Sequence, residues 1–145
     1  MNYNNSLKSK EMRSSLGGFI SDYSINKYNK DWDYCLGLSY RYNVKNLKWR
    51  NNIKGLFKNL YNEDNKIDGF IVNEYDSNFN NIHHHLIIKS DLKERDLSKI
   101  ISKSWDNIGL SDLKVYDSKL DYCNYIVKHY GKGEENEIDM LVSLI

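Results

Sequence analysis

The sequence predicts an α+β fold in which a central, mostly antiparallel β-sheet is flanked by helices. Three observations lead to this prediction. A run with strict alternation at 34–42 is typical of a half-buried strand, and two β-branched runs at 66–75 and 81–90 flank a polar turn. Apolar residues recur at helical spacing in the segments between the strands. The predicted order is strand, helix, strand, strand, helix, strand, helix.

The size and composition are those of one globular domain. The chain has 145 residues, of which 40% are hydrophobic and 28% are charged, a balance that excludes an intrinsically disordered chain. No apolar run approaches the roughly 18 residues that span a bilayer, and the N-terminus lacks the apolar stretch of a signal peptide. Two cysteines, Cys35 and Cys123, are too few for a secreted disulfide scaffold. We therefore expect a soluble, cytoplasmic protein with no membrane partner.

Periodicity and charge both change along the chain. Residues 1–30 show weak periodicity, and we expect a partly ordered N-terminal leader there, followed by one domain over 31–145. Residues 1–60 carry eleven Lys or Arg against four Asp or Glu, whereas residues 61–145 carry ten against sixteen. A basic first half could contact phosphates and an acidic second half could hold a cation, although solvated surface charges would give the same counts.

The first two elements of the predicted domain are a strand and a helix. The strand places five apolar or aromatic residues on one side, namely Tyr34, Leu36, Leu38, Tyr40 and Tyr42. The helix, within 44–64, has a basic outer face and an apolar stripe at i, i+3, i+4 and i+7, formed by Ile53, Leu56, Phe57 and Leu60.

The later elements begin with a hairpin of the runs 66–75 and 81–90. Ser90 or Asp91 is a plausible N-cap for a second helix, because apolar residues follow it at helical spacing. These residues are Leu97, Ile100, Ile101, Trp105 and Ile108. A short strand is predicted at 113–117, followed by a helix over 120–133 that ends at Gly131.

Three consecutive histidines lie on the second strand of the hairpin. Because side chains alternate along a strand, His83 and His85 point to the same side and lie about 6.5–7 Å apart, so they could converge on one ion. Glu74, at the end of the partner strand, adds a carboxylate. This mixed nitrogen and oxygen set suits Mg²⁺ or Mn²⁺ more than structural zinc. Alternatively, the histidines are hydrogen-bonded polar residues and Glu74 is a solvated charge.

A tyrosine and a lysine share one face of the last predicted helix, because Tyr125 and Lys128 are three residues apart. A phenol with a pKa near its usual value of about 10 is a poor nucleophile. It becomes useful when a metal polarises its target and a cation stabilises the developing charge. Lys128 could supply that cation, although the chain has 12 tyrosines and 17 lysines and neither residue is distinctive alone.

The order of these motifs resembles the HUH endonucleases, and more narrowly the single-tyrosine rolling-circle replication initiators (Rep proteins) of small phages, plasmids and viruses. The resemblance covers roughly 34–132. LGLSYRY is similar to the first family motif, IHHHLII to the second and NYIVKHYGK to the third. It implies the family's sandwich of a central antiparallel sheet with outer helices, which is similar to the RRM fold.

The resemblance also implies an activity and the residues that perform it. His83, His85 and Glu74 would hold Mn²⁺ or Mg²⁺, Tyr125 would be the nucleophile and Lys128 its helper. The enzyme would nick and rejoin single-stranded DNA at an origin hairpin, through a 5′-phosphotyrosine link and a free 3′-hydroxyl. A separate or host helicase and polymerase would complete replication in the host cell's cytoplasm.

Three positions depart from, or refine, the family pattern. His129 stands where the two-tyrosine members have their second tyrosine, so the pattern implies a one-tyrosine enzyme, with Tyr122 one turn upstream as the alternative nucleophile. Lys128 stands where related transposases have Gln, which favours an initiator. His84 occupies a slot that is normally apolar, and it could be a buried, hydrogen-bonded residue on the opposite face.

DNA contacts are expected mostly at phosphates, with stacking on aromatic rings. The candidates are Arg41, Lys45, Lys48, Trp49, Arg50, Lys54 and Lys58. Trp49 could stack on a base or pack in the core, and the basic residues could form a solvated helix face.

Three other functions are compatible with the same residues. The domain could bind single strands without catalysis, or it could be a transposase or relaxase with the same chemistry. A zinc protein unrelated to DNA is the third alternative, although Cys123 and His129 form no recognised zinc spacing with the histidine strand.

Overall fold

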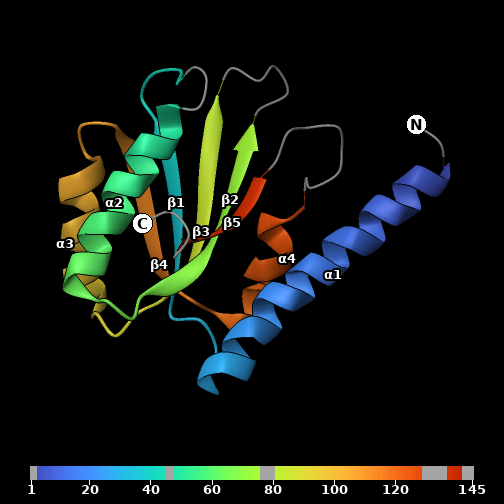
Figure 1. The fold of residues 1–145 in the computed structure, drawn as a ribbon. Coiled ribbons are helices and arrows are strands. Elements are labelled where there is room, and N and C mark those ends of the chain that lie inside the picture. Colours follow the sequence, from blue (N-terminus) through green and yellow to red (C-terminus); the bar gives the residue numbers. More distant parts are fainter. Residues whose placement is uncertain (1–2, 45–47, 76–80, 129–136, 142–145) are drawn as a thin grey trace.

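A five-stranded sheet lies between two layers of helices in the computed structural model, which describes residues 3–44, 48–75, 81–128 and 137–141. Helices α2 (Trp49–Glu63) and α3 (Glu94–Trp105) cover one face of the sheet. Helices α1 (Tyr3–Tyr28) and α4 (Tyr122–Ile126) lie on the other face (Figure 1). The predicted α+β class, with a central antiparallel sheet and outer helices, is confirmed.

Every neighbouring pair of strands in the sheet is antiparallel, in the order β4-β1-β3-β2-β5. The strands are β1 (Tyr34–Tyr40), β2 (Asp68–Tyr75), β3 (Ile82–Lys89), β4 (Gly109–Val115) and β5 (Glu137–Met140). β2 and β3 form the predicted hairpin, and residues 76–80 of its loop lie outside the described part. β1 ends at Tyr40, so Tyr42 is 82% exposed and does not join the buried side as predicted.

The layer of α2 and α3 is held by the apolar stripes that the sequence shows. All four predicted apolar residues of α2 are buried against the sheet, as are Leu97, Ile101 and Trp105 of α3. The predicted N-cap of α3 is wrong, because α3 begins at Glu94. The Ser90 hydroxyl instead donates a hydrogen bond to Asp64 Oδ2 at 2.7 Å, which holds it in the preceding turn.

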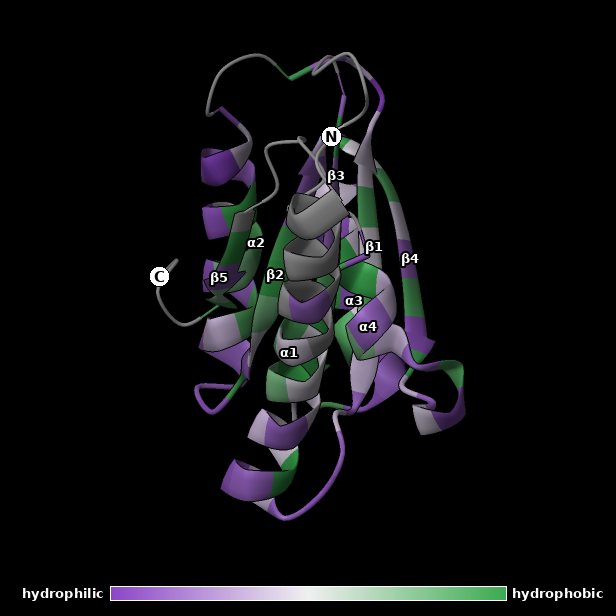
Figure 2. Ribbon diagram, turned by 90° about the vertical axis from the view of Figure 1, so that its right-hand side faces the viewer, coloured by the Kyte–Doolittle hydropathy of each residue, from purple (hydrophilic) through white to green (hydrophobic). Residues whose placement is uncertain are grey.

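Residues 3–28, predicted as a partly ordered leader, form the continuous helix α1. In its described side chains the buried positions are Gly17, Ile20 and Ser24, which recur at helical spacing. Two of these three residues are small and carry no hydropathy signal, which explains the weak periodicity. In Figure 2 the strands carry most of the hydrophobic colour behind α1 and α4.

Aromatic and polar contacts fix the C-terminal half of α1 to the sheet. The Tyr23 ring stacks on Trp32, with centroids 5.8 Å apart, and meets Phe70 edge-on. The buried Asp68 carboxylate accepts hydrogen bonds from Tyr23, Tyr28 and Lys27. Burial opposes ionisation of this carboxyl, but the hydrogen bonds from the three side chains outweigh burial and lower its pKa.

We expect Asp68→Asn to lower the free energy of unfolding at pH 7 by about 2 kcal/mol, the scale of hydrogen bonds to a charged group. Because the folded-state pKa lies below the unfolded value, the stabilisation is present above about pH 4 and is lost as the pH falls through the folded-state pKa. Urea titrations of wild type, Asp68→Asn and the exposed control Asp22→Asn, at pH 7 and pH 3, measure this. An equal deficit of Asp68→Asn at both pH values would contradict the assignment.

The last part of the chain differs most from the prediction. β4 begins at Gly109, four residues before the predicted strand, and the predicted helix over 120–133 is a 3₁₀ turn at Ser118–Leu120 followed by α4. Gly131, its expected end, lies outside the described residues. The sequence did not predict β5. Among the described residues, no helix is long and apolar enough to span a membrane.

Candidate functional site

The two predicted ligand histidines and Glu74 share the sheet face that carries α4. The register of the hairpin pairs Glu74 with His83 and Val72 with His85. His85 Nε2 lies 3.2 Å from Glu74 Oε2, and both side chains are about one-fifth exposed. His83 is exposed on the same face of β3. Strand alternation therefore places all three residues as the sequence predicted.

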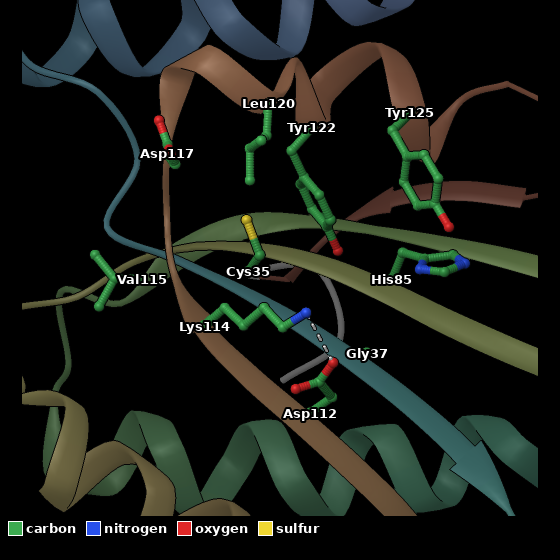
Figure 3. Close-up of a pocket in the computed structure, with 10 residues that line it drawn as sticks. All are labelled: Cys35, Gly37, His85, Asp112, Lys114, Val115, Asp117, Leu120, Tyr122 and Tyr125. Atoms are coloured by element: carbon green, nitrogen blue, oxygen red, sulfur yellow. Dashed lines mark ion pairs between the residues drawn. The ribbon is translucent and has the colours of Figure 1, made fainter.

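Tyr125 comes from α4 to meet this group. Its ring lies edge-on to the His85 imidazole, with centroids 6.0 Å apart and planes at 86°. The Lys128 ammonium lies over the same ring, 3.6 Å from its centroid. Tyr125 is 49% exposed, and its hydroxyl points toward His85 (Figure 3). Glu74, His85, Tyr125 and Lys128 thus form one chain of contacts, with a solvent-accessible phenol at its centre.

Tyr122, the alternative nucleophile, is placed differently. Its ring lies beside that of Tyr125, with centroids 6.0 Å apart and planes at 26°, and its hydroxyl points to the sheet (Figure 3). That hydroxyl donates to the Leu86 carbonyl at 3.5 Å. Burial raises the pKa of the Tyr122 phenol well above its usual value, so its phenolate is disfavoured. The geometry therefore favours Tyr125 over Tyr122 as a nucleophile.

His84 lies on the opposite face of the sheet, in the core beneath α2 and α3. Its Nδ1 is 2.6 Å from Asn73 Oδ1, and its Nε2 is 2.7 Å from the Tyr40 hydroxyl. Burial lowers the pKa of His84 to about 3, so the ring is neutral, with one nitrogen donating and the other accepting. Both partners are satisfied inside the core, which explains how a histidine occupies the motif's apolar slot.

The donor set fits a hard or borderline divalent ion without forming a closed cage. In the part of the chain that the structure describes, no three His, Cys, Asp or Glu side chains are gathered closely enough to hold a metal ion. Glu74 and His85 are in contact, and His83 follows on the same face. Mg²⁺ and Mn²⁺ take few protein ligands and complete their shells with water or substrate oxygens, so these donors are chemically suited to them.

The basic candidates for DNA contacts do not line this face. Lys48, Lys54 and Lys58 are exposed on or beside α2, in the layer on the other side of the sheet from Tyr125. Arg41 is exposed just beyond β1, and Lys45 lies outside the described residues. A strand bound at Tyr125 would have to pass around the sheet to reach α2.

Trp49 is corrected from a stacking platform to a core residue. It is only 2% exposed, and its indole N–H donates to the Tyr75 hydroxyl at 3.1 Å. The Arg50 guanidinium lies over the Trp49 ring, 5.2 Å from the centroid, on the outside of the core. Trp49 therefore packs, which was the other role that the sequence allowed.

A cavity of about 360 Å³ borders Tyr125 and contains residues that the sequence did not single out (Figure 3). It lies between β1 and β4 below and the 118–125 segment above. Its lining is formed by Cys35, Gly37, His85, Asp112, Lys114, Val115, Asp117, Leu120, Tyr122 and Tyr125. A glycine inside a strand often marks the close approach of a ligand, so Gly37 carried a signal in the sequence. Asp112 carried none.

The position of α4 depends on a close contact with α1. A Cβ added at Gly17 would lie 1.9 Å from Asn124 Oδ1 and 3.1 Å from Asn124 Cα. The Asn124 amide is itself held, because its Nδ2 donates to both carboxylate oxygens of Asp121 at 2.9 and 3.0 Å. Asp121 starts α4 in the left-handed conformation, with φ 51°. Glycine at position 17 therefore lets α1 seat the helix that carries Tyr125.

We expect Gly17→Ala and Gly18→Ala to change stability in opposite directions. Gly17→Ala must displace Asn124 and should lower the free energy of unfolding by about 1–3 kcal/mol, the usual cost of overpacking. A Cβ at Gly18 meets nothing within 4 Å, so Gly18→Ala should gain about 0.5–1 kcal/mol from helix propensity. Urea or thermal unfolding measures both variants, and equal effects would contradict close packing at Gly17.

Comparison with known proteins gives one match. The family model for the replication-associated protein ORF2 matches residues 33–134. No curated protein and no solved structure matches the chain. The matched segment covers more than half of the chain and includes both histidines of the site, Glu74, Tyr125 and Lys128.

Proposed function

Because the chain belongs to this family of replication-associated proteins, we propose that it initiates replication by nicking and rejoining single-stranded DNA. The observation that supports this most directly is the half-exposed Tyr125 phenol, which lies between the Glu74–His85 pair and the Lys128 ammonium. A nucleophile, a set of metal-binding donors and a cation are thus next to each other on one open sheet face. This is the set of groups that a transfer of a phosphodiester to tyrosine needs.

The proposed reaction is a transesterification. Tyr125 Oη attacks the phosphorus of one phosphodiester, a new Oη–P bond forms, and the P–O3′ bond breaks. The phenol proton is lost to solvent, and the leaving O3′ takes up a proton to become a free 3′-hydroxyl. Attack of a 3′-hydroxyl on the phosphotyrosine reverses the step, so the number of phosphodiester bonds is conserved and no ATP is needed. The free 3′-hydroxyl could then prime a separate polymerase.

Each residue of the site has a defined part in this proposal. Glu74, His83 and His85 would hold Mn²⁺ or Mg²⁺, and such an ion would polarise the scissile phosphate. Lys128, over the Tyr125 ring, would stabilise the negative charge that develops on the phenol and phosphate oxygens. The contact with His85 would orient the Tyr125 ring.

A denaturing protein gel tests the proposed activity. The purified protein is mixed with fluorescent single-stranded oligonucleotides that cover candidate origin hairpins, with Mn²⁺ or with EDTA. The proposal predicts a labelled band at the summed mass of protein and 3′ fragment, present with Mn²⁺ and lost with EDTA. Tight binding of an oligonucleotide with no covalent band under either condition would instead support a non-catalytic single-strand-binding module.

A further inference from the structure

We infer that the cavity beside Tyr125 is a slot for one nucleobase of the bound strand, next to the attacked phosphate, and that it favours guanine. This inference rests on the proposed function, because it concerns the substrate of the same site. It adds a part of the protein that would choose where the strand is cut. The residues that would read the base are Asp112 and Lys114 of β4.

The cavity adjoins the reacting phenol directly. His85 and Tyr125 form one wall of it, so a phosphate held at these two residues would have its neighbouring nucleotide at the cavity mouth. The volume of about 360 Å³ lies at the lower end of the usual range for small-molecule pockets, roughly 300–1,000 Å³. A planar group of one or two rings would fit there, whereas a duplex would not.

The walls suit the flat faces of a base. The Tyr122 ring stands between Leu120 and Tyr125 in Figure 3, with Cys35 below it on β1. Leu120 and Val115, also in the lining, are 73% and 59% exposed, which is unusual for large apolar side chains unless a ligand covers them. Stacking of bases on aromatic and apolar side chains gives single-strand binding much of its energy.

The floor of the cavity continues past the reacting phenol. Gly37 has open space where a side chain would be, with nothing within 4 Å of an added Cβ. A second hollow, of about 430 Å³, shares Gly37, His85 and Asp112 with the first and extends toward His83. A strand could therefore cross the sheet with its phosphate at His85, one nucleotide in each hollow and no side chain of Gly37 in its way.

The polar edge of the cavity favours guanine. Asp112 Oδ2 and Lys114 Nζ lie 3.5 Å apart at the open side, as the dashed line in Figure 3 shows. An ionised carboxylate only accepts hydrogen bonds, and an ammonium only donates them. The Watson–Crick edge of guanine offers two adjacent N–H groups and one carbonyl oxygen. It could thus satisfy both oxygens of Asp112 and the Lys114 ammonium together.

Selection from a random library tests the slot without a known origin sequence. Proteins that carry Tyr125→Phe, which keeps the ring but removes the hydroxyl, are used to select binders from single-stranded DNA of twenty random nucleotides. The selection is repeated with Asp112→Asn added, and with Asp106→Asn added as the matched control, since Asp106 is exposed at the end of α3. The best selected strand is then measured with an abasic nucleotide placed at each position in turn.

The inference predicts one position that is strongly enriched in guanine and at which an abasic nucleotide weakens binding at least about tenfold, the scale of a stacked and hydrogen-bonded base. Asp112→Asn should remove the guanine preference at that position alone, and Asp106→Asn should leave it intact. Pools without a position-specific guanine, or an identical preference in Asp112→Asn, would overturn the inference. Because the readout is binding, failure of the slot is distinguishable from failure of the nicking chemistry.

Discussion

Tyr125→Phe is expected to abolish the covalent protein–DNA adduct, with a loss of at least about 10³-fold in the rate of its formation. The substitution removes the attacking oxygen and keeps the ring that contacts His85 and Lys128. Binding of the same oligonucleotide should change less than about threefold, because the phenol is half exposed and the ring remains. A gel assay gives the adduct rate, and fluorescence anisotropy gives the affinity.

Tyr122→Phe is the matched control for this prediction. Tyr122 lies one turn away and its ring is adjacent to that of Tyr125, but its hydroxyl is buried against the Leu86 carbonyl. Adduct formation by Tyr122→Phe should stay within about tenfold of wild type. An adduct that survives Tyr125→Phe and disappears in Tyr122→Phe would reverse the two roles and contradict the geometry described above.

The double substitution His83→Ala and His85→Ala is expected to remove both divalent-ion binding and ion-dependent cleavage. Without the two imidazoles, Glu74 would be the single remaining donor of the set, and one carboxylate does not retain Mn²⁺ against water. Isothermal titration calorimetry with Mn²⁺ measures the binding loss independently of DNA. Cleavage should fall to the level that wild type shows in EDTA.

Charge-matched variants keep the metal prediction specific. Glu74→Gln should weaken Mn²⁺ binding at least about tenfold, because it replaces a charged donor with a neutral amide. Glu63→Gln, at the exposed end of α2 on the other side of the sheet, should leave it unchanged. Full Mn²⁺-dependent cleavage by the double histidine variant would contradict the metal assignment.

The parts of the fold that could be predicted are those in which one periodicity is continuous. The apolar stripe of α2 and the β-branched runs of the hairpin are long and regular, so both were recognised and confirmed. Helix α1 escaped prediction because Gly17 and Ser24 form much of its buried stripe. β5 has only four residues, too few to show alternation, and its pairing with β2 is a long-range contact.

The site divides in the same way. Alternation along β3 placed His83 and His85 on one face, and helical spacing placed Lys128 next to Tyr125. Burial could not be predicted from spacing, because it depends on which layer covers a residue. For this reason the sequence left open whether Trp49 packs or stacks and whether Tyr122 can replace Tyr125.

The cavity could not be predicted because it is formed between distant segments. Its walls come from β1, β4 and the 118–125 turn and helix, which meet only in the folded chain. The charged pair on β4 alternates like any exposed strand residues, and nothing in its spacing relates it to Tyr125. Tertiary structure is therefore what links β4 to the proposed chemistry.

Identification of the modified residue tests the proposed chemistry most directly. The covalent product of wild-type protein and a cleaved oligonucleotide is digested with protease and nuclease, and tandem mass spectrometry locates the residual nucleotide on the peptide. The proposed mechanism predicts a phosphate ester on Tyr125, joined to the 5′ end of the 3′ fragment. A nucleotide on any other residue, or a cleaved strand with no nucleotide attached to the protein, would contradict it.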